Sequence, residues 1–520
     1  MLLVACGARE QDAPGDRPDD QSGSSDVFKP AIIEKPVPGE PQSGGTLTVA
    51  EVAQPRSLDP AKTLSSGTTG GTVMAAIYDP LMRFDMEQKK FVPQLAESVE
   101  PNDDYTQWTI TMRDGVKFSD GTPVDADAVI GSMKYYLDNK GYDAGVIGPL
   151  WKGAHKVDDR TVRVDLAEPW GTFDATLALG FGHIVAPAAI EGGQDHFKPI
   201  GAGPFIFASH SQNEELVLQA NPDYWDGKPY LDKLRFVWLG PDQTKTETFD
   251  GEQVQGALIQ DPQLVKKYRE AETAGFTWAY SRSDLLLVNH REGRPGHDPK
   301  VRAAITHAIE PETLYDRIFD GIGQPGKELW IENSAWANDA EVPPYDTELA
   351  KQELAEAKTD GYDGELTFVA LSSATERDAA LTLTAQLEAA GFTVKVDTLR
   401  NPAEMVQRVM FDTDYDISRT SLMMSDEHVA SRLYAQMHSK SFKNQMGYAS
   451  PEMDRLIEEL RALPADQQAD TMRKIEEQYH RDFASVNLGG STWYYMFGDN
   501  VHGLVPNTEM MPLFAKAWVS

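Results

Sequence analysis

A strand, a helix and a second strand follow one another between Leu366 and Val396. The helix is predicted from apolar residues at helical spacing over 379–390, and it ends before Gly391, a residue typical of helix C-termini. The segment 393–396 is rich in β-branched residues, which is typical of a strand. Two strands joined through a helix run parallel with a right-handed crossover, so this order predicts an α/β fold.

Further strands and helices are predicted on both sides of this unit. Alternating β-branched residues indicate strands, and an apolar face at helical spacing indicates helices. The predicted strands cover 46–50, 108–112, 161–166 and 234–239, and the predicted helices cover 299–308 and 451–462. A chain of 520 residues exceeds one ordinary domain, so we expect two or three lobes. No apolar run approaches the roughly 18 residues of a transmembrane helix.

The charge of the chain excludes one class of partner. Acidic residues number 81 against 48 basic residues, which gives a formal net charge of -33. Such a chain repels the phosphates of DNA and RNA, so we expect no nucleic-acid partner. The excess of acid is typical of a solvated, soluble surface. Steering of cationic ligands toward the protein is the alternative interpretation.

The single cysteine lies close to the N-terminus. Residues 3–7 have the form of a bacterial lipobox, in which Cys6 would carry a diacylglycerol. Only residues 1–5 precede it, so the charged start and most of the apolar core of a signal peptide are missing, and a chance cysteine is the alternative. Residues 7–43 are rich in Asp, Pro, Ser, Gly, Glu and Gln, which predicts a disordered tether between a membrane anchor and a folded body.

A search for catalytic, phosphate-binding and metal-binding motifs yields none that is complete. Zinc-protease, Gly-x-Ser-x-Gly and P-loop motifs are absent from the sequence. We therefore predict that the protein is not an enzyme and binds no cofactor. The glycine-rich segment 65–71 lacks the lysine of a P-loop and is interpreted as a loop before a helix, or as an edge of a ligand cleft. Residues 412–416 resemble the start of a calcium loop, but Ile417 and Met423 stand where Gly and Glu are needed. The eleven histidines show no metal-ligand spacing.

Several blocks of sequence, in a fixed order, resemble those of one known protein family. The most specific block is RDGVKFSDGTPV at 113–124, with ADAV at 126–129. The other blocks lie at 57–60, 77–81, 93–98, 200–205, 221–225 and 298–305. With these residues the chain resembles the extracellular solute-binding proteins of ABC importers, family 5, which include oligopeptide-, dipeptide- and nickel-binding proteins. The resemblance covers about 44–512.

The resemblance implies two lobes joined by crossing segments at a hinge, with a ligand cleft between them and an extra inserted subdomain. We place the first lobe at 44–77, 187–285 and 491–520, the inserted subdomain at 78–186 and the second lobe at 286–490. Closure of the lobes on a ligand would present the protein to the permease subunits of an ABC importer. We expect an extracytoplasmic monomer that touches the membrane only through its lipid anchor.

The resemblance also implies ligand contacts. In peptide-binding members an aspartate of the second lobe pairs with the amino terminus of the peptide. The matching position here is Ser425 or Asp426, and we favour Asp426. Met424 and its neighbour Met423 offer adaptable apolar contact, with core packing as the alternative. The other residues implied to line the cleft are Thr69, Phe181, Tyr280, Arg282, Trp493 and Tyr494.

The class of ligand stays open at this point. The loop 370–374 lacks the arginine that dipeptide binders place there, with Arg377 the nearest base, so the sequence favours longer peptides over a strict dipeptide clamp. The favoured function is capture of an oligopeptide for import. The alternatives are the same role for a sugar, siderophore, haem or metal chelate, and a lipoprotein that senses peptides.

Overall fold

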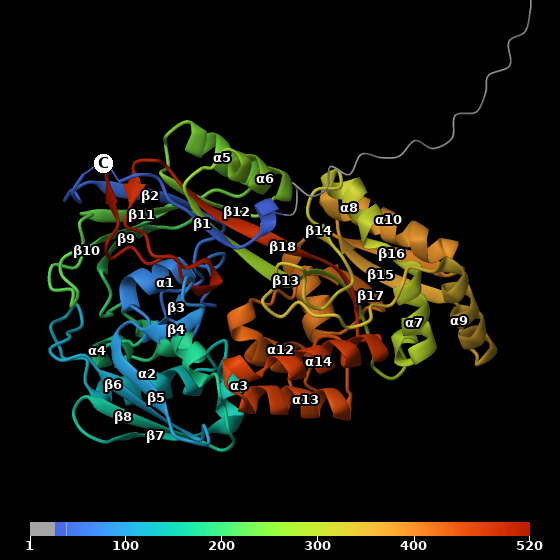
Figure 1. The fold of residues 1–520 in the computed structure, drawn as a ribbon, viewed down its shortest axis with the longest axis horizontal. Coiled ribbons are helices and arrows are strands. Elements are labelled where there is room, and N and C mark those ends of the chain that lie inside the picture. Colours follow the sequence, from blue (N-terminus) through green and yellow to red (C-terminus); the bar gives the residue numbers. More distant parts are fainter. Residues whose placement is uncertain (1–25, 38) are drawn as a thin grey trace, which may run out of the picture.

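The computed structural model describes residues 26–37 and 39–520, and its architecture is mixed α/β (Figure 1). One long sheet runs between two helix-covered lobes, and a second, smaller sheet lies beside one of them in the same view. No helix in the described ranges is long and apolar enough to cross a membrane.

The long sheet is built from strands spread over most of the chain. Its strands are β1 (Ala31–Ile33), β2 (Thr46–Glu51), β9 (Phe205–Ser211), β10 (Glu215–Ala220), β11 (Lys233–Trp238), β12 (Gly256–Ile259), β13 (Gly275–Val288), β14 (Gln324–Pro325), β15 (Glu365–Leu371), β16 (Thr393–Leu399), β17 (Ile417–Thr420) and β18 (Val486–Phe497). Their order is β16-β15-β17-β13-β18-β12-β2-β11-β10-β9, with β1 beside β13 and β14 beside β18. The sheet therefore continues from one lobe into the other.

Two long strands, β13 and β18, make this continuity. They pair antiparallel from Gly275 opposite Met496 to Leu286 opposite Val486, with a shift of register between Tyr280 and Asp284. The C-terminal end of β13 also pairs with β17, and the C-terminal end of β18 pairs with β12. Because both strands belong to both lobes, they are the segments about which the lobes can rotate.

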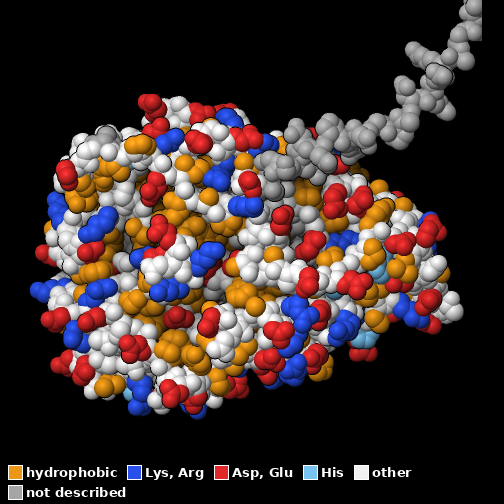
Figure 2. Space-filling model, in the orientation of Figure 1, with side chains coloured by type: hydrophobic (Ala, Val, Ile, Leu, Met, Phe, Trp, Pro, Cys, Tyr) orange, Lys and Arg blue, Asp and Glu red, His pale blue; other side chains and the backbone are white. Residues whose placement is uncertain are grey.

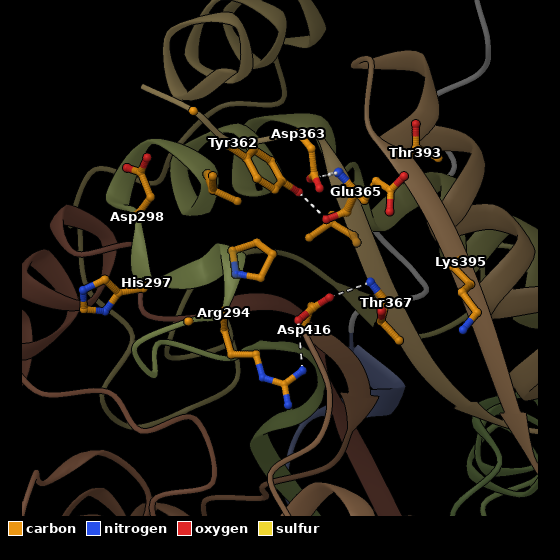
Figure 3. A pocket seen from close by; sticks show the side chains of 15 residues that line it. Arg294, His297, Asp298, Tyr362, Asp363, Glu365, Thr367, Thr393, Lys395 and Asp416 are labelled. Atoms are coloured by element: carbon orange, nitrogen blue, oxygen red, sulfur yellow. Dashed lines mark hydrogen bonds and ion pairs between the residues drawn. The ribbon is translucent and has the colours of Figure 1, made fainter. Parts of the chain in front are cut away.

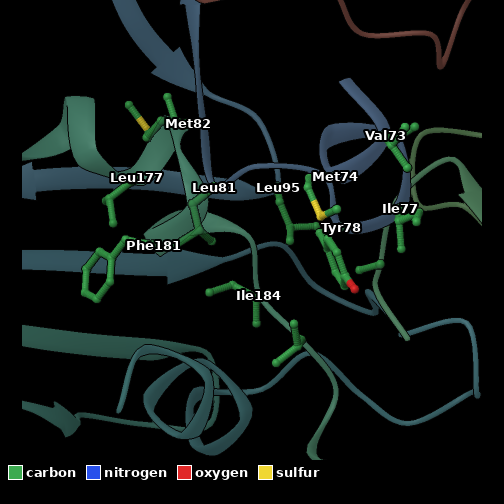
Figure 4. Close-up of a cluster of buried hydrophobic side chains, with 14 of the residues drawn as sticks. Val73, Met74, Ile77, Tyr78, Leu81, Met82, Leu95, Leu177, Phe181 and Ile184 are labelled. Atoms are coloured by element: carbon green, nitrogen blue, oxygen red, sulfur yellow. The ribbon is translucent and has the colours of Figure 1, made fainter. Parts of the chain in front are cut away.

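The predicted inserted subdomain carries its own sheet but shares a core with the first lobe. Its strands are β5 (Ala96–Pro101), β6 (Gln107–Met112), β7 (Trp151–Lys156) and β8 (Thr161–Leu166), and they pair in the order β5-β6-β8-β7. The hairpin of β3 (Met82–Asp85) and β4 (Lys90–Pro93) and the short pair β19 (Val501–His502) and β20 (Trp518–Val519) complete the strands of the described part. Apolar side chains from α1 (Gly71–Tyr78) and the inserted part share one buried cluster (Figure 4).

Helices cover both faces of the long sheet. On the β2 side they are α5 (Asp242–Asp250) and α6 (Pro262–Glu270). Away from the long sheet, α2 (Ala126–Asp138) and α3 (Ala144–Ile147) lie in the predicted inserted subdomain, and α4 (Pro187–Ile190) follows it. The helices of the other lobe are α7 (Pro299–Ala308), α8 (Pro311–Phe319), α9 (Thr347–Thr359), α10 (Ala374–Ala389), α11 (Pro402–Val406), α12 (Val429–Met437), α13 (Pro451–Ala462) and α14 (Ala469–Arg481).

The strands and helices predicted from periodicity are confirmed, with small changes at their ends. The strand–helix–strand unit is β15, α10 and β16, and the two strands are parallel. Helix α10 begins at Ala374, earlier than predicted, and the Ser373 side chain caps it by accepting from the backbone N–H of Glu376. Its first turn is polar, so periodicity alone does not reveal it. The glycine-rich segment 65–71 leads into α1 as one of its two interpretations predicted.

The predicted disordered tether over 7–43 needs correction in its last part. Residues Asp26–Phe28 form a short 3-10 helix, and Ala31–Ile33 form β1, which pairs antiparallel with β13. Phe28 is 2% exposed. Two interactions order this segment despite its polar composition. Apolar side chains such as Phe28 are buried against the body, and the backbone of β1 forms hydrogen bonds with β13. Cys6 lies outside the described residues.

Candidate functional site

Aromatic side chains line one face of the crossing strands β13 and β18. Side chains alternate between the two faces of a strand, so Trp278 and Tyr280 share a face on β13. Trp493 of β18 lies on this face as well, and its ring centroid is 4.6 Å from that of Tyr280. Tyr280 is fully buried, and its hydroxyl has no hydrogen-bond partner among the described residues. The predicted residues Tyr280 and Trp493 therefore come together.

Three side chains from 425–432, which the predicted bounds place in the second lobe, reach the segment 508–510, which they place in the first. Ser425 donates a hydrogen bond of 3.1 Å to Glu509 Oε1, and Arg432 of α12 forms an ion pair of 2.9 Å with the same oxygen. The ring of His428 is hydrogen-bonded to the Thr508 hydroxyl at 2.9 Å. These contacts hold the two lobes together.

The charged groups at this junction affect one another. Burial alone would raise the pKa of Glu509, but the Arg432 guanidinium, His428 and hydrogen bonds hold it below its usual value. Glu427 has no such cation, and burial, together with the nearby carboxylates of Asp426 and Glu509, raises its pKa to about 8. Its Oε2 is buried and has no partner in the described part of the chain. We call Tyr280, Glu427, Arg432, Trp493 and Glu509 the interlobe cluster.

Asp426, the favoured partner of a ligand amine, contacts its own lobe instead. Its two carboxylate oxygens accept hydrogen bonds of 2.6 Å from the Ser334 hydroxyl and from the backbone N–H of Ala335. Its carbonyl oxygen accepts from the Trp336 indole at 2.9 Å. Burial raises the pKa of Asp426. In the neighbouring Glu427, which the family register did not indicate, one carboxyl oxygen has no partner among the described residues.

Met424 and Arg282 are buried among partners outside the interlobe cluster. Met424 is fully buried in the core of the second lobe, and its backbone pairs with Ser281. The Arg282 guanidinium is also fully buried, and it donates to the Gln436 side chain at 3.2 Å while lying 5.4 Å from the centre of the Tyr479 ring. The structure therefore gives both residues packing partners and does not place them in the interlobe cluster.

Phe181, Tyr494 and Thr69 are likewise not part of the interlobe cluster. Phe181 is 1% exposed and packs within the core shown in Figure 4, with its ring perpendicular to that of Trp151. Tyr494 follows Trp493 directly, so it points to the opposite face of the sheet, where its hydroxyl donates to the Thr273 carbonyl. The Thr69 hydroxyl donates to the Leu64 carbonyl at 2.8 Å and closes its own loop.

The loop that contains Thr69 contacts the backbone of Glu509, a member of the interlobe cluster. The backbone N–H of Gly67 donates to the Glu509 carbonyl at 2.8 Å. A Cβ atom at Gly67 would collide with the backbone of Met510, so glycine is required there. Glu509 itself has a left-handed backbone with φ of 55°, which directs its side chain toward Arg432. Nothing in the local sequence around Glu509 indicates this geometry.

A separate polar groove of about 740 Å³ lies within the second lobe (Figure 3). Its charged groups pair with one another: Arg294 contacts Asp416 at 3.3 Å and Asp414 at 2.9 Å, and Asp416 also accepts from the backbone N–H of Thr367. The Tyr362 hydroxyl donates to the Glu365 carbonyl. We call this region the lobe II groove, and we do not assign it a ligand, because its half-buried Arg294 and its buried Asp416 already have partners. Asp414 and Asp416 belong to the calcium-like segment, and the described residues contain no group suited to a metal ion.

Comparison with known proteins decides the family. Residues 90–444 match the family described as bacterial extracellular solute-binding proteins, family 5. The chain belongs to this family. Members are extracellular solute-binding proteins by that description, as the resemblance implied. The chain is 26% identical to the oligopeptide-binding protein AppA of Bacillus subtilis over 502 residues, 90% of this chain and 89% of that protein.

Other relatives are named for different ligands. Haem-binding protein A of Haemophilus influenzae is 28% identical over 61% of this chain. Di/tripeptide-binding protein 2 of Pseudomonas aeruginosa is 29% identical over 60% of it. The matches span 62% and 63% of those two relatives' own lengths.

Solved structures share the fold. The DppA protein of Helicobacter pylori in complex with the peptide STSA has a TM-score of 0.76 at 22% identity, covering 92% of this chain and 98% of that one. NikA of Brucella suis in complex with Fe(III)-EDTA has a TM-score of 0.76 at 20% identity, covering 92% and 100%. The two-lobe, periplasmic-binding-protein-like α/β fold is thereby confirmed.

Proposed function

We propose that this protein captures a peptide between its two lobes and delivers it to an ABC importer. One observation carries the proposal: at the lobe junction, Tyr280 and Glu427 bury polar atoms that no described residue satisfies. Buried polar atoms are costly unless they are hydrogen-bonded, so a bound solute is the natural partner for both. Membership of the solute-binding family and the likeness to peptide-binding relatives support the same conclusion.

The chemistry of the interlobe cluster favours a ligand with a cationic group beside an apolar one. A ligand ammonium would pair with Glu427, whose pKa of about 8 would fall as the pair forms. Tyr280 and Trp493 offer aromatic faces for an apolar side chain. Acidic side chains are spread over the whole visible face of the molecule in Figure 2, which would raise the local concentration of cationic ligands.

A flat haem or metal chelate is the second candidate. The paired rings of Tyr280 and Trp493 would also suit a planar ring system, and relatives named for haem and Fe(III)-EDTA share the family or the fold. The buried acid of Glu427 favours the peptide, because it can lose its proton and pair with a ligand ammonium, whereas an anionic chelate would form no ion pair with it.

Capture would proceed by rotation of the lobes about β13 and β18. The predicted lobes, 44–77 with 187–285 and 491–520 against 286–490, place Glu509 on one side and Ser425 and Arg432 on the other. The ion pair and hydrogen bonds between them form only when the lobes meet. A ligand that contacts both lobes shifts the equilibrium toward this closed state. We further propose that the protein acts outside the cytoplasm as a monomer, lipid-anchored through Cys6, and catalyses no reaction.

Native mass spectrometry of the purified protein, before and after denaturation, tests the proposal. We expect a series of peptide masses bound to the native protein. Glu427→Gln should reduce the bound fraction, whereas the matched variant Glu365→Gln in the lobe II groove should not. A single haem or chelate mass would support the second candidate. Peptides whose retention depends on Glu365 rather than Glu427 would contradict the placement of the site.

A further inference from the structure

The segment 26–33, which we call the N-terminal strap, first contacts the face of the crossing strands opposite the interlobe cluster and then pairs, as β1, with β13. Thr277 and Thr492 point to this face, because they alternate along β13 and β18 with the aromatic residues of the cluster. Figure 1 shows β1 alongside β13 where the long strands leave the first lobe. The strap and the interlobe cluster are therefore separated by the sheet itself.

The strap is bound firmly to the first lobe. The Thr277 hydroxyl accepts from the backbone N–H of Ala31 and donates to the Lys29 carbonyl, both at 2.8 Å. Arg269 of α6 donates to the Val27 carbonyl at 3.2 Å. The Phe28 ring is buried in the apolar cluster between α6 and β18. This segment is a folded part of the body.

The strap also reaches the second lobe through a chain of hydrogen bonds. The Thr492 hydroxyl donates to the Phe28 carbonyl at 2.5 Å. The same hydroxyl accepts from the Gln324 side chain at 2.9 Å, and Gln324 in turn accepts from the Asn333 amide at 2.8 Å. Gln324 lies in β14, a strand between α8 and α9 of the second lobe, which pairs with β18. Thus Phe28 is linked to both lobes.

A small cavity of about 110 Å³ lies behind the crossing strands, and both lobes and the strap contribute to its wall. The hydroxyls of Ser283 and Ser491, at the point where the strands pass between the lobes, are buried without a partner among the described residues. The wall of the cavity includes Phe28 of the strap, Gln260 and Pro262 of the first lobe, and Tyr315, Phe319 and Gln324 of the second lobe. The space behind the hinge is therefore narrow, and Phe28 forms one side of it.

We propose that the N-terminal strap is a wedge behind the hinge that holds the lobes closed. Rotation about β13 and β18 that separates Arg432 from Glu509 at the front must bring the first and second lobes closer at the back. The strap lies on the side of the crossing strands away from Arg432 and Glu509, so it opposes that rotation. Its hydrogen bonds through Thr492 and Gln324 stabilise the closed arrangement of the lobes. The inference rests on the proposed lobe closure but not on the identity of the ligand.

Distances between spin labels on the two lobes test the wedge. In a Cys6→Ser background, Lys228→Cys and Gln352→Cys place labels on exposed positions of the first and second lobes. Phe28→Ala with Thr492→Val removes the ring and the link to the second lobe. In stripped protein we expect these changes to raise the share of long, open-state distances at least three-fold.

Phe249→Ala is the matched control, because Phe249 packs on the same apolar cluster but does not line the cavity. It should lower the melting temperature to a similar extent while leaving the distance distribution unchanged. Equal distance distributions in the strap variant and this control would overturn the wedge. Because no ligand is needed, a failure of the peptide proposal leaves this result intact, and a failed wedge leaves peptide capture untouched.

Discussion

The interlobe cluster and the lobe II groove are both polar, yet they differ in where their partners lie. In the groove, Arg294, Asp414 and Asp416 satisfy one another within one lobe. In the cluster, the partner of Arg432 comes from the other lobe, and Glu427 keeps one oxygen unengaged. The central charges of the groove are therefore satisfied within one lobe. A site that depends on lobe closure is recognised by bonds that cross between lobes and by polar atoms without partners.

The largest effect that separates the two regions is expected from Glu509→Gln. It leaves the buried Arg432 guanidinium without its carboxylate, which costs about 3 to 5 kcal/mol of unfolding free energy when a buried ion pair loses one member. Chemical denaturation measures this loss. The double variant Glu509→Gln with Arg432→Met should recover most of it, because no charge is then left unpaired. A single variant as stable as the parent would contradict the pairing.

Glu427→Gln should weaken retention of cationic peptides without destabilising the fold. A hydrogen bond to a charged group is worth about 1.5 to 3 kcal/mol, so we expect roughly a ten-fold or greater loss of affinity. Isothermal titration of stripped protein with the peptides found bound to it measures the loss. Unchanged affinity would show that the ligand amine binds elsewhere.

The pH dependence of stability should also separate Glu427 from its surroundings. The folded-state pKa of Glu427 is about 8, above its ordinary value near 4.5, so the unfolded chain loses this proton first as the pH rises. Its contribution to the unfolding free energy therefore falls between pH 4.5 and 8. His428 acts in the opposite sense at lower pH, because burial lowers its pKa to about 4.

Thermal unfolding of the parent and of Glu427→Gln over pH 5 to 9 isolates the contribution of Glu427. The parent should lose stability relative to the variant as the pH rises, since glutamine does not titrate. Parallel curves for the two proteins would mean that the carboxyl group is not buried as the structure has it.

The smallest effect is expected in the lobe II groove. Lys395 is 77% exposed on its side chain and pairs with Asp397 at 3.3 Å. Exposed ion pairs contribute about 0 to 1 kcal/mol, so Lys395→Ala should leave both stability and ligand retention nearly unchanged. Native mass spectrometry and thermal unfolding check this together. A marked loss of bound ligand would make the groove, rather than the lobe junction, the place of capture.

Local patterns in the sequence predicted most of the fold. Strand alternation and helix periodicity placed β8, α7 and α13 with the bounds observed, because each depends on neighbouring residues. The strap was missed because burial of Phe28 depends on a surface supplied by distant residues such as Tyr494. Composition averages over a segment and cannot show such a docking surface.

The site could be predicted only in part. The family resemblance named Tyr280 and Trp493, whose rings lie together in the structure, and alternation along the strand explains why Tyr494 points away. Asp426 was favoured over Ser425 by register, and Glu427 was not considered; only the bonds from Ser334 and Ala335 to Asp426 distinguish it from Glu427. Such contacts between distant segments leave no mark in a single sequence.

Amide hydrogen exchange of ligand-bound and stripped protein tests the central claim, capture at the lobe junction, most directly. Binding should slow exchange in 421–432 and 507–511, which meet across the junction through Arg432 and Glu509, while 361–367 in the lobe II groove stays unchanged. Protection confined to 361–367, with none across the junction, would contradict capture between the lobes.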